Sequence, residues 1–355
     1  MTIPKNPTRI LIIRTDRIGD VVLTTPALKA IRQAYSHAHV TLMVSPLTKD
    51  LVEGHPYIND LIIDDQLGLY RGFIGFLQLC RKIRQGQYDV AVILHTKNRY
   101  NWACFLAGVP CRIAYKNEKG GFLLTDPIHD ERSLGYKHES EYCMDVAVHL
   151  GAKPLELTPS IVQSPQAESW ANQWFKEHVP DSFQLIVLHP GASDQTKCWP
   201  IENFIALPDK LSNVYLTKIA IIGSGPTSLL AKEIIKKSRV PVLDLTDQCT
   251  LAQTAALLRR STLLISNDSG PVHVAAAVGC MVVNLFLRNQ PGINAKRWQP
   301  LAKQAITLIN KDEDAVIVNK DSQMIGGNKS SISVDTVLSA VDDLMRRNVQ
   351  STFLY

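Results

Sequence analysis

The sequence predicts an α/β protein made of two Rossmann-like halves, each with a parallel sheet covered by helices. Three observations lead to this class. The chain has 355 residues, more than one hydrophobic core usually serves. Short apolar, β-branched segments alternate with helical segments in both halves, which is typical of doubly wound parallel sheets. Between the halves, a segment with Pro154, Pro159 and Pro165 reads as a linker over residues 152–166.

The expected elements follow this alternation. In the first half we expect strands at 9–14, 40–44, 61–63, 90–94 and 112–115, and helices at 21–35, 71–85, 98–107 and 136–151. In the second half we expect strands at 184–189, 218–222, 262–265 and 281–286, and helices at 166–178, 201–211, 226–238 and 271–278. The domains are then 1–160 and 161–332, followed by a C-terminal helix and tail at 333–355. A polar segment rich in Gly and Asn, at 310–332, reads as an exposed loop.

The composition is that of a folded, soluble protein, with 45% hydrophobic and 20% charged residues. The net charge of +5 favours anionic partners, and no nucleic-acid-binding motif is visible. Seven scattered cysteines without a Cys-x-x-Cys pair indicate a reducing compartment and no metal site. The apolar run at 10–13 is too short for a signal peptide, and no run is long enough to span a membrane. We therefore expect a cytoplasmic protein with at most peripheral membrane contact.

The chain is organised around residues 261–286, which read as strand, turn, helix and strand. The turn Asn267-Asp268-Ser269-Gly270 lies between a strand's carboxyl end and a helix's amino end, where open α/β sheets bind anionic ligands. Asp268 could accept a hydrogen bond from a ribose hydroxyl, while Ser269 and Gly270 could donate to a phosphate, with His273 one turn further on. Alternatively, Asp268 only caps the helix and His273 is only a packed histidine.

A second candidate loop, residues 189–200, follows the strand at 184–189. Gly191 permits a tight turn, Ser193 and Thr196 offer hydroxyls, and Lys197 offers a positive charge for a diphosphate. The alternative is a surface loop held by Trp199.

A third turn, Gly223-Ser224-Gly225-Pro226, half matches the glycine fingerprint of dinucleotide-binding proteins, with Asp244 placed as a ribose ligand. A dinucleotide-dependent dehydrogenase is therefore an alternative class. The match is incomplete, because Ser228 stands where the third Gly belongs.

The amino-terminal strand leads into the turn Thr15-Asp16-Arg17-Ile18-Gly19-Asp20. A carboxylate here could remove the proton of an attacking hydroxyl, and Asp20 is the better candidate for such a base. Alternatively, Asp20 merely caps the helix. Asp16 is the weaker candidate, and Arg17 could contact an acidic acceptor.

Basic residues gather in residues 66–125, which hold nine Lys and Arg against two acidic residues. We interpret the run Arg81 to Arg84 as a solvated helix face. Lys97, Arg99 and Arg112 are better placed to bind an acceptor with carboxylates or phosphates.

Three segments together resemble glycosyltransferase family 9, the ADP-heptose:lipopolysaccharide heptosyltransferases. They are the runs 267–277 and 14–28 and the His189-Pro-Gly loop with its Lys197-Cys-Trp-Pro continuation. The resemblance implies two Rossmann-like domains facing a central cleft (the GT-B architecture), ADP-heptose as donor, and no cofactor or metal. It also implies an inner-core acceptor, either Kdo or heptose. Asp20 would be the catalytic base, Lys197 would contact the diphosphate, and Gly223 and Ser224 would border the nucleotide pocket. By analogy, the last helix could pack back on the first domain.

The sequence departs from the family pattern in three places. Ser269 replaces a usual Thr, Cys280-Met281 replaces a frequent Pro, and residues 287–291 replace Gly-Pro-Thr-Asp-Pro. These changes leave the donor sugar open. A different donor, an epimerase activity and a non-catalytic nucleotide-binding protein all stay possible.

Overall fold

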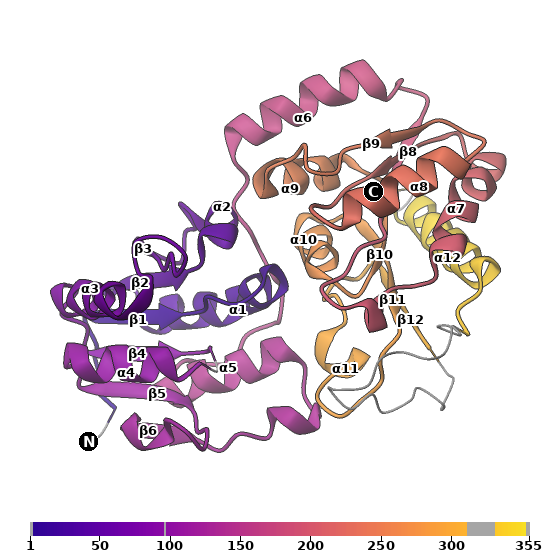
Figure 1. The fold of residues 1–355 in the computed structure, drawn as a ribbon. Coiled ribbons are helices and arrows are strands. Elements are labelled where there is room, and N and C mark those ends of the chain that lie inside the picture. Colours follow the sequence, from indigo (N-terminus) through magenta and orange to yellow (C-terminus); the bar gives the residue numbers. More distant parts are fainter. Residues whose placement is uncertain (1–2, 96, 311–330, 353–355) are drawn as a thin grey trace. The chain divides into compact units, whose positions relative to one another are not determined.

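The computed structural model describes residues 3–95, 97–310 and 331–352. The chain divides into two compact units, Met1–Val162 and Gln163–Tyr355 (Figure 1). The sequence places the division between residues 160 and 161, inside the linker. The first part of that linker is bound to the first unit, since the Ser160 N–H donates to Thr25 Oγ1 at 2.9 Å and the Val162 N–H donates to the Leu51 carbonyl at 2.9 Å.

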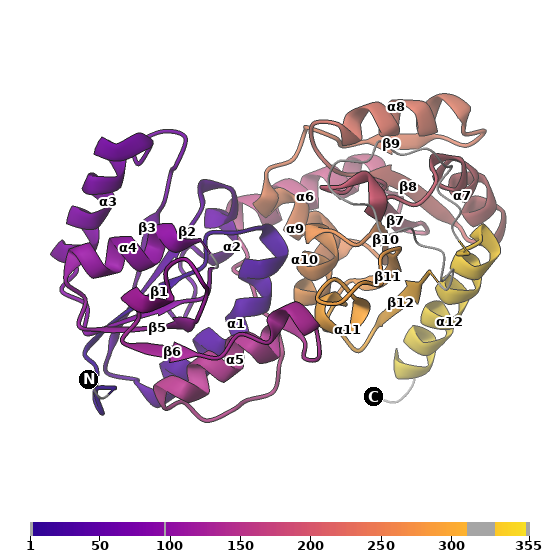
Figure 2. The same ribbon diagram turned by 60° about the horizontal axis from the view of Figure 1, so that its bottom comes forward.

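The first unit contains a six-stranded parallel sheet in the order β3-β2-β1-β4-β5-β6. The central strand β1 pairs Ile12 with Leu42 on one side and Val92 on the other. Helices α1 and α5 lie together on one face, and α3 and α4 lie together on the other (Figure 2). The strands are β1 Arg9–Ile13, β2 His39–Val44, β3 Asp60–Ile63, β4 Val90–Ile93, β5 Cys111–Tyr115 and β6 Asp126–Ile128. The α-helices are α1 Ile18–Ala34, α2 Lys49–Val52, α3 Gly72–Gln85, α4 Asn98–Ala107 and α5 Glu139–Leu150.

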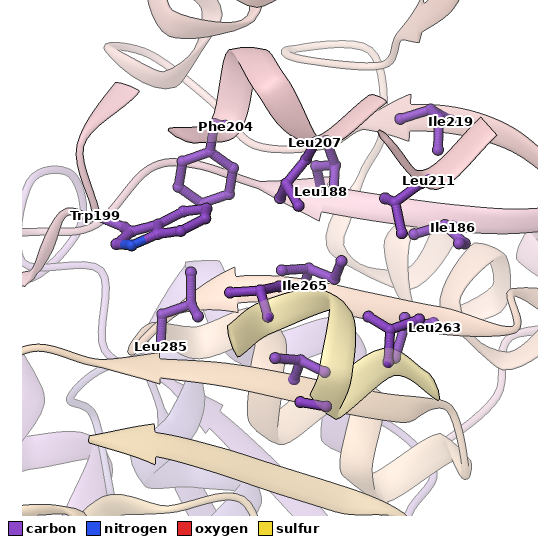
Figure 3. Packing of buried hydrophobic residues seen from close by; sticks show 14 of the residues in the cluster. Ile186, Leu188, Trp199, Phe204, Leu207, Leu211, Ile219, Leu263, Ile265 and Leu285 are labelled. Atoms are coloured by element: carbon purple, nitrogen blue, oxygen red, sulfur yellow. The ribbon is translucent and has the colours of Figure 1, made fainter. Parts of the chain in front are cut away.

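The second unit repeats this plan with the strand order β12-β11-β10-β7-β8-β9, again parallel. One face of its sheet packs against α7, α8 and α12, around Trp199, Phe204 and Leu207 (Figure 3). The strands are β7 Gln184–His189, β8 Thr217–Ile221, β9 Val242–Asp244, β10 Leu263–Asn267, β11 Met281–Phe286 and β12 Ala305–Ile309. The α-helices are α6 Pro165–His178, α7 Ile201–Val214, α8 Thr227–Lys237, α9 Leu251–Arg260, α10 Gly270–Val278, α11 Ala295–Trp298 and α12 Val334–Thr352.

The last helix, α12, belongs to the core of the second unit. In its described part, α12 contacts α7, β11 and β12, and its residues Val337, Val341 and Leu344 are buried in the core of the second unit. The apolar face of the helix is thus used within the second unit, and the expectation that the helix also packs back on the first domain stays a prediction. The polar segment interpreted as a loop at 310–332 lies almost entirely outside the described residues.

Both sheets are parallel throughout, so in each unit the carboxyl ends of the strands meet at one edge. Loops at this edge are where open α/β sheets hold their ligands. The candidate residues after β1, β7, β8 and β10 therefore lie at the ligand-binding edge of their own sheet. Among the described residues, no helix combines the length and the apolar character needed to cross a membrane.

Candidate functional site

A buried cation, Arg14, organises the carboxyl edge of the first sheet. It follows β1 directly, and only 3% of its side chain is exposed. Its Nη1 donates to the Leu94 carbonyl beyond β4 at 3.0 Å. Its Nη2 donates to Glu139 Oε1 at 2.9 Å and also to Asp20 Oδ1. Burial lowers the pKa of Arg14, but nearby carboxylates, Asp16 among them, outweigh burial and raise it, so this cation stays charged.

Asp20 does not cap its helix. Helix α1 begins at Ile18, with Arg17 as a cap residue that makes no side-chain capping bond. Asp20 is in the first helical turn and its carboxylate is bound by the guanidinium of Arg14. The capping alternative is therefore wrong, and the structure places this side chain beside a cation at a helix amino end, which favours negative charge.

Glu139, which the sequence did not single out, completes the cluster around Arg14. It is the first residue of α5, whose start is fixed by a capping box between His138 and Glu141. The neighbouring Ser140 hydroxyl donates to the Leu23 carbonyl of α1 at 2.7 Å. This bond between the helices sets Glu139 beside Arg14. The capping box could have marked the helix start, but no local signal pairs residues so far apart in the sequence.

Asp16 is the carboxyl group of this cluster with a perturbed acidity. Burial, with repulsion from Asp20 and Glu139, raises the pKa of Asp16 to about 6 despite the neighbouring Arg14. Its Oδ1 lies 3.6 Å from Arg14 Nε and 3.6 Å from His95 Nε2. Burial and the Arg14 cation lower the pKa of His95 to about 4, so this histidine is neutral at pH 7. The edge thus contains several carboxylates around one cation, and one of them exchanges protons near neutral pH.

The corresponding edge of the second unit is built on Asn267, at the end of β10. Its side-chain oxygen accepts from the Trp199 N–H at 2.9 Å, and its side-chain nitrogen donates to the Pro190 carbonyl at 2.6 Å. Trp199 also donates from its indole to the Ile332 carbonyl at 2.8 Å and packs edge-on against Phe204 (Figure 3). Both ends of the loop after β7 are therefore fixed, which positions Lys197 between them.

Lys197 and Asp268, predicted from separate motifs, form an ion pair here. The Lys197 Nζ donates to Asp268 Oδ2 at 2.6 Å, and the two side chains are 13% and 8% exposed. Asp268 directly precedes α10, whose cap residue Ser269 makes no side-chain capping bond. A cation, a carboxylate that can accept from hydroxyls, and a helix amino end thus meet at one place.

Ser269 and His273 turn inward. The Ser269 hydroxyl lies 3.1 Å from His189 Nδ1 and donates to the Asn267 carbonyl at 3.0 Å, so the hydroxyl faces the sheet. Burial lowers the pKa of His189 to about 4, which keeps that ring neutral. His273 is buried within the first turns of α10. Gly270 begins that helix, and helix amino ends carry backbone N–H groups without helical partners.

Gly191 and Gly223 have a shared packing role that the sequence did not indicate. A Cβ atom on Gly191 would lie 2.0 Å from Thr227 Oγ1, and one on Gly223 would lie 2.6 Å from Thr227 Cγ2. Gly223 also has a φ of 140°, in the region that favours glycine. The buried Thr227, in the first turn of α8, is thus enclosed by both loops. The only local signal was a glycine in each loop.

The remaining hydroxyl candidates differ in their surroundings. The Thr196 hydroxyl donates to Asp194 Oδ1 at 2.8 Å, so this hydroxyl stabilises the turn. The Ser193 side chain is exposed. Ser224 accepts through its carbonyl from the Thr227 N–H at 3.3 Å. Asp244, the ribose ligand of the dehydrogenase alternative, instead accepts from Thr246 at 2.6 Å.

Comparison with known proteins decides the family. The model of glycosyltransferase family 9 (heptosyltransferase) matches residues 76–325, well over half of the chain. The chain belongs to glycosyltransferase family 9. It is therefore a glycosyltransferase of the heptosyltransferase class, which excludes the dehydrogenase alternative.

Relatives match over nearly the whole length of this family 9 chain. Lipopolysaccharide heptosyltransferase 3 of Escherichia coli is 22% identical over 95% of this chain and 99% of the relative. The crystal structure of a family 9 glycosyltransferase from Veillonella parvula has a TM-score of 0.81 at 24% identity, covering 97% of this chain and 98% of that one. The structure of E. coli ADP-heptose lps heptosyltransferase II has a TM-score of 0.76 at 21% identity, covering 96% and 99%. These likenesses confirm the GT-B class of two Rossmann-like domains.

The structure separates the four cations expected to bind an acceptor. Arg17 and Lys97 are exposed at the carboxyl edge of the first sheet. Arg99 is half-buried there, where its Nη2 donates to the Tyr70 carbonyl at 2.9 Å. Arg112 lies near the start of β5, at the opposite edge. Its Nε donates to the Leu123 carbonyl at 2.7 Å, so Arg112 holds a loop and is not brought to the candidate site.

The segment that departs from the family pattern adds a cation to the second edge. Arg288, just beyond β11, donates from Nη1 to Asp194 Oδ2 at 3.1 Å. This contact and hydrogen bonds from Thr196 lower the pKa of Asp194. Arg288 thus reaches the loop that carries Lys197. The sequence marked this segment as unusual but did not assign its arginine to the site.

Proposed function

We propose that this family 9 enzyme transfers heptose from ADP-heptose to the inner core of lipopolysaccharide, onto Kdo or a heptose already attached, with inversion of configuration. The observation that carries the proposal is the Lys197–Asp268 pair at the amino end of α10. A nucleoside diphosphate sugar offers that pair both diphosphate oxygens and hydroxyl groups. Two E. coli relatives, a lipopolysaccharide heptosyltransferase and an ADP-heptose heptosyltransferase, support the same donor and acceptor.

On the donor side, Lys197 and the amino end of α10 neutralise the diphosphate as it departs. Asp268 accepts hydrogen bonds from donor hydroxyls, and the backbone at Gly270 donates to a phosphate. Gly191, Gly223 and the neighbouring loops shape the nucleotide pocket, with Ser193, Ser224 and His273 as further contacts.

On the acceptor side, Asp20 removes the proton of the attacking hydroxyl while that oxygen bonds to the anomeric carbon and the bond to the diphosphate breaks. Arg14 orients the Asp20 carboxylate through their hydrogen bond. Asp16 and Glu139 contact the same cation, so Arg14 does not pair with Asp20 alone. Arg17 and Lys97 bind acidic groups of the acceptor, and Arg99 lines the same edge.

The proposal also covers location and cofactors. The acceptor is lipid-linked, so the enzyme acts from the cytoplasm with peripheral contact at the inner membrane, and nucleic acid is not a partner. We propose that transfer needs neither metal nor cofactor, because Lys197 and α10 supply positive charge to the leaving group. Activity in EDTA should then stay within about twofold of the untreated rate. Loss of activity that Mg²⁺ restores would contradict this.

The experiment is ADP release from ADP-heptose by the full chain, with and without Kdo-containing lipid A. Release should require the acceptor and should fall by roughly 10²–10⁴-fold in Asp20→Asn, since that variant lacks the base. Asp181→Asn, an exposed carboxylate in the second unit, is the matched control and should keep its rate. An Asp20→Asn variant that transfers at the normal rate would remove Asp20 from the role. Binding of ADP without any release would favour a non-catalytic protein.

A different donor sugar is the second candidate, and Arg288 is the observation that favours it. Arg288 belongs to the segment 287–291, which differs from the usual family sequence, and it contacts Asp194 in the loop that carries Lys197. A screen of nucleoside diphosphate sugars distinguishes the two candidates, because release from another donor at a higher rate than from ADP-heptose would reassign the substrate.

A further inference from the structure

Five large apolar side chains project into solvent from one stretch of the first unit. They come from the loop after β3 and the first turns of α3, and we name this stretch the 67–77 prominence. Their exposed fractions are 88% for Leu67, 63% for Leu69, 74% for Phe73, 73% for Ile74 and 45% for Leu77. Scattered exposed leucines are ordinary on a protein surface, but a contiguous apolar group marks an interaction site.

The prominence is a formed structure. Asp65 Oδ1 accepts from the Leu67 N–H at 3.2 Å and the Gly68 N–H at 2.9 Å. The Tyr70 N–H donates to the Asp65 carbonyl at 2.8 Å, and the Tyr70 side chain is buried in the core. Arg99 on α4 holds the Tyr70 carbonyl from the other side. The apolar side chains are therefore presented outward by a fixed turn.

Basic side chains accompany this apolar group on α3. Arg71 lies within it, and Arg81 and Lys82 follow on the exposed face of α3. Residues 66–125 contain nine Lys and Arg but only two acidic residues. One of these, Asp89, has its carboxylate bound by the Arg9 N–H at 3.0 Å. Exposed basic side chains thus lie in the prominence at Arg71 and further along the same helix at Arg81 and Lys82.

The neighbouring helix of the first unit also carries exposed aromatic side chains. Helix α4 packs beside α3 (Figure 2). It carries the exposed Trp102 and Phe105, whose ring centroids lie 6.2 Å apart in an edge-to-face arrangement. Phe122 is exposed and meets Trp102 at 5.9 Å. Exposed aromatic residues next to cations are typical of surfaces that lie at the boundary between headgroups and acyl chains.

We propose that the 67–77 prominence docks this enzyme onto a bilayer that carries anionic lipid headgroups. Leu67, Phe73 and Ile74 enter the headgroup boundary, while Arg81 and Lys82 pair with headgroup phosphates. A second copy of the chain is a poorer occupant, because a symmetric contact would bring two positively charged surfaces together. The inference deepens the proposed function, on which it rests, because α3 begins at the sheet edge that carries Asp20 and would present this edge to a lipid-linked acceptor.

The test is cosedimentation of the full chain with vesicles of phosphatidylcholine mixed with phosphatidylglycerol, and with vesicles of phosphatidylcholine alone. The wild type should bind the anionic vesicles more tightly, and added salt should weaken that binding. The variant Leu67→Ser/Phe73→Ser/Ile74→Ser should lose at least about tenfold in vesicle partition. Because these side chains are largely exposed, the variant should keep the unfolding midpoint of the wild type.

Matched control variants distinguish binding through this surface from nonspecific binding to vesicles. Val214→Ser/Leu216→Ser/Leu229→Ser removes three exposed apolar side chains from the second unit and should leave partition unchanged. For charge, Arg81→Glu/Lys82→Glu should lose at least about tenfold in binding to anionic vesicles. Lys232→Glu/Lys236→Glu, a pair of exposed lysines on α8, should not.

Failure of docking and failure of the proposed function give different results. Transfer to a soluble, delipidated acceptor should be equal in the wild type and the serine variant. If the serine variant still binds vesicles as the wild type does, the proposed docking surface is wrong. It is also wrong if sedimentation velocity shows that the wild type is a dimer and the serine variant a monomer. Specific vesicle binding by a protein that transfers to no acceptor would support docking and count against the proposed function alone.

Discussion

Replacement of Lys197 by Ala tests the donor site most directly. The Lys197 Nζ lies 2.6 Å from Asp268 Oδ2, and both side chains are almost fully buried. The substitution removes a charged hydrogen-bond donor, which is worth about 1.5–3 kcal/mol. It also leaves the Asp268 carboxylate without its cation, close to the proposed position of the diphosphate. We expect the Kd for ADP to rise about ten- to hundredfold.

Titration calorimetry with ADP measures this effect. Lys236→Ala, which removes an exposed lysine from α8, is the control and should leave the Kd unchanged. The double variant Lys197→Ala/Asp268→Asn should bind ADP better than Lys197→Ala alone, because it removes the uncompensated carboxylate. An ADP affinity of Lys197→Ala equal to that of the wild type would refute the assignment of Lys197 to the diphosphate.

Two further predictions concern the first unit. Because burial raises the folded-state pKa of Asp16 to about 6, its ionisation disfavours the folded state, and stability is lost as pH rises through that pKa. Asp16→Asn should therefore exceed the wild type in free energy of unfolding by roughly 1–3 kcal/mol above pH 6 and match it below the ordinary pKa of an aspartate. Urea unfolding at several pH values measures this, and a pH-independent difference would contradict it. Arg112→Ala should leave the acceptor KM unchanged but cost about 1–2 kcal/mol of stability, since its guanidinium holds the Leu123 carbonyl; a KM raised severalfold with normal stability would restore its acceptor role.

The sequence was informative where structure depends on neighbouring residues. The strand, turn and helix around Asp268 and the turn before Asp20 follow from local patterns of apolar, turn-forming and capping residues. The missed strands β6, β9 and β12 all lie at sheet edges. β6 and β9 have only three residues each, so they lack the signal of a buried strand, whereas β12 is an apolar segment of five residues whose local signal was overlooked.

Contacts between residues far apart in the chain could not be predicted from the sequence. The bond between Arg14 and Glu139 joins residues 125 positions apart, and it depends on how α5 packs on α1. Arg112 was misjudged for a related reason. Strand boundaries predicted from sequence are uncertain by a few residues. The sequence therefore did not show whether Arg112 lies at the amino end or the carboxyl end of its strand. In the structure it lies at the amino edge, away from the carboxylates.

Thr227 makes two loops at the carboxyl edge of the second sheet interdependent. Gly191 and Gly223 both pack against this one side chain, so a change of backbone path in either loop alters the space available to the other. Exchange of the 189–200 loop between relatives would therefore disturb the turn at Gly223 unless residue 227 is exchanged with it. Chimeras designed to change donor preference should treat these two loops and the first turn of α8 as a single module.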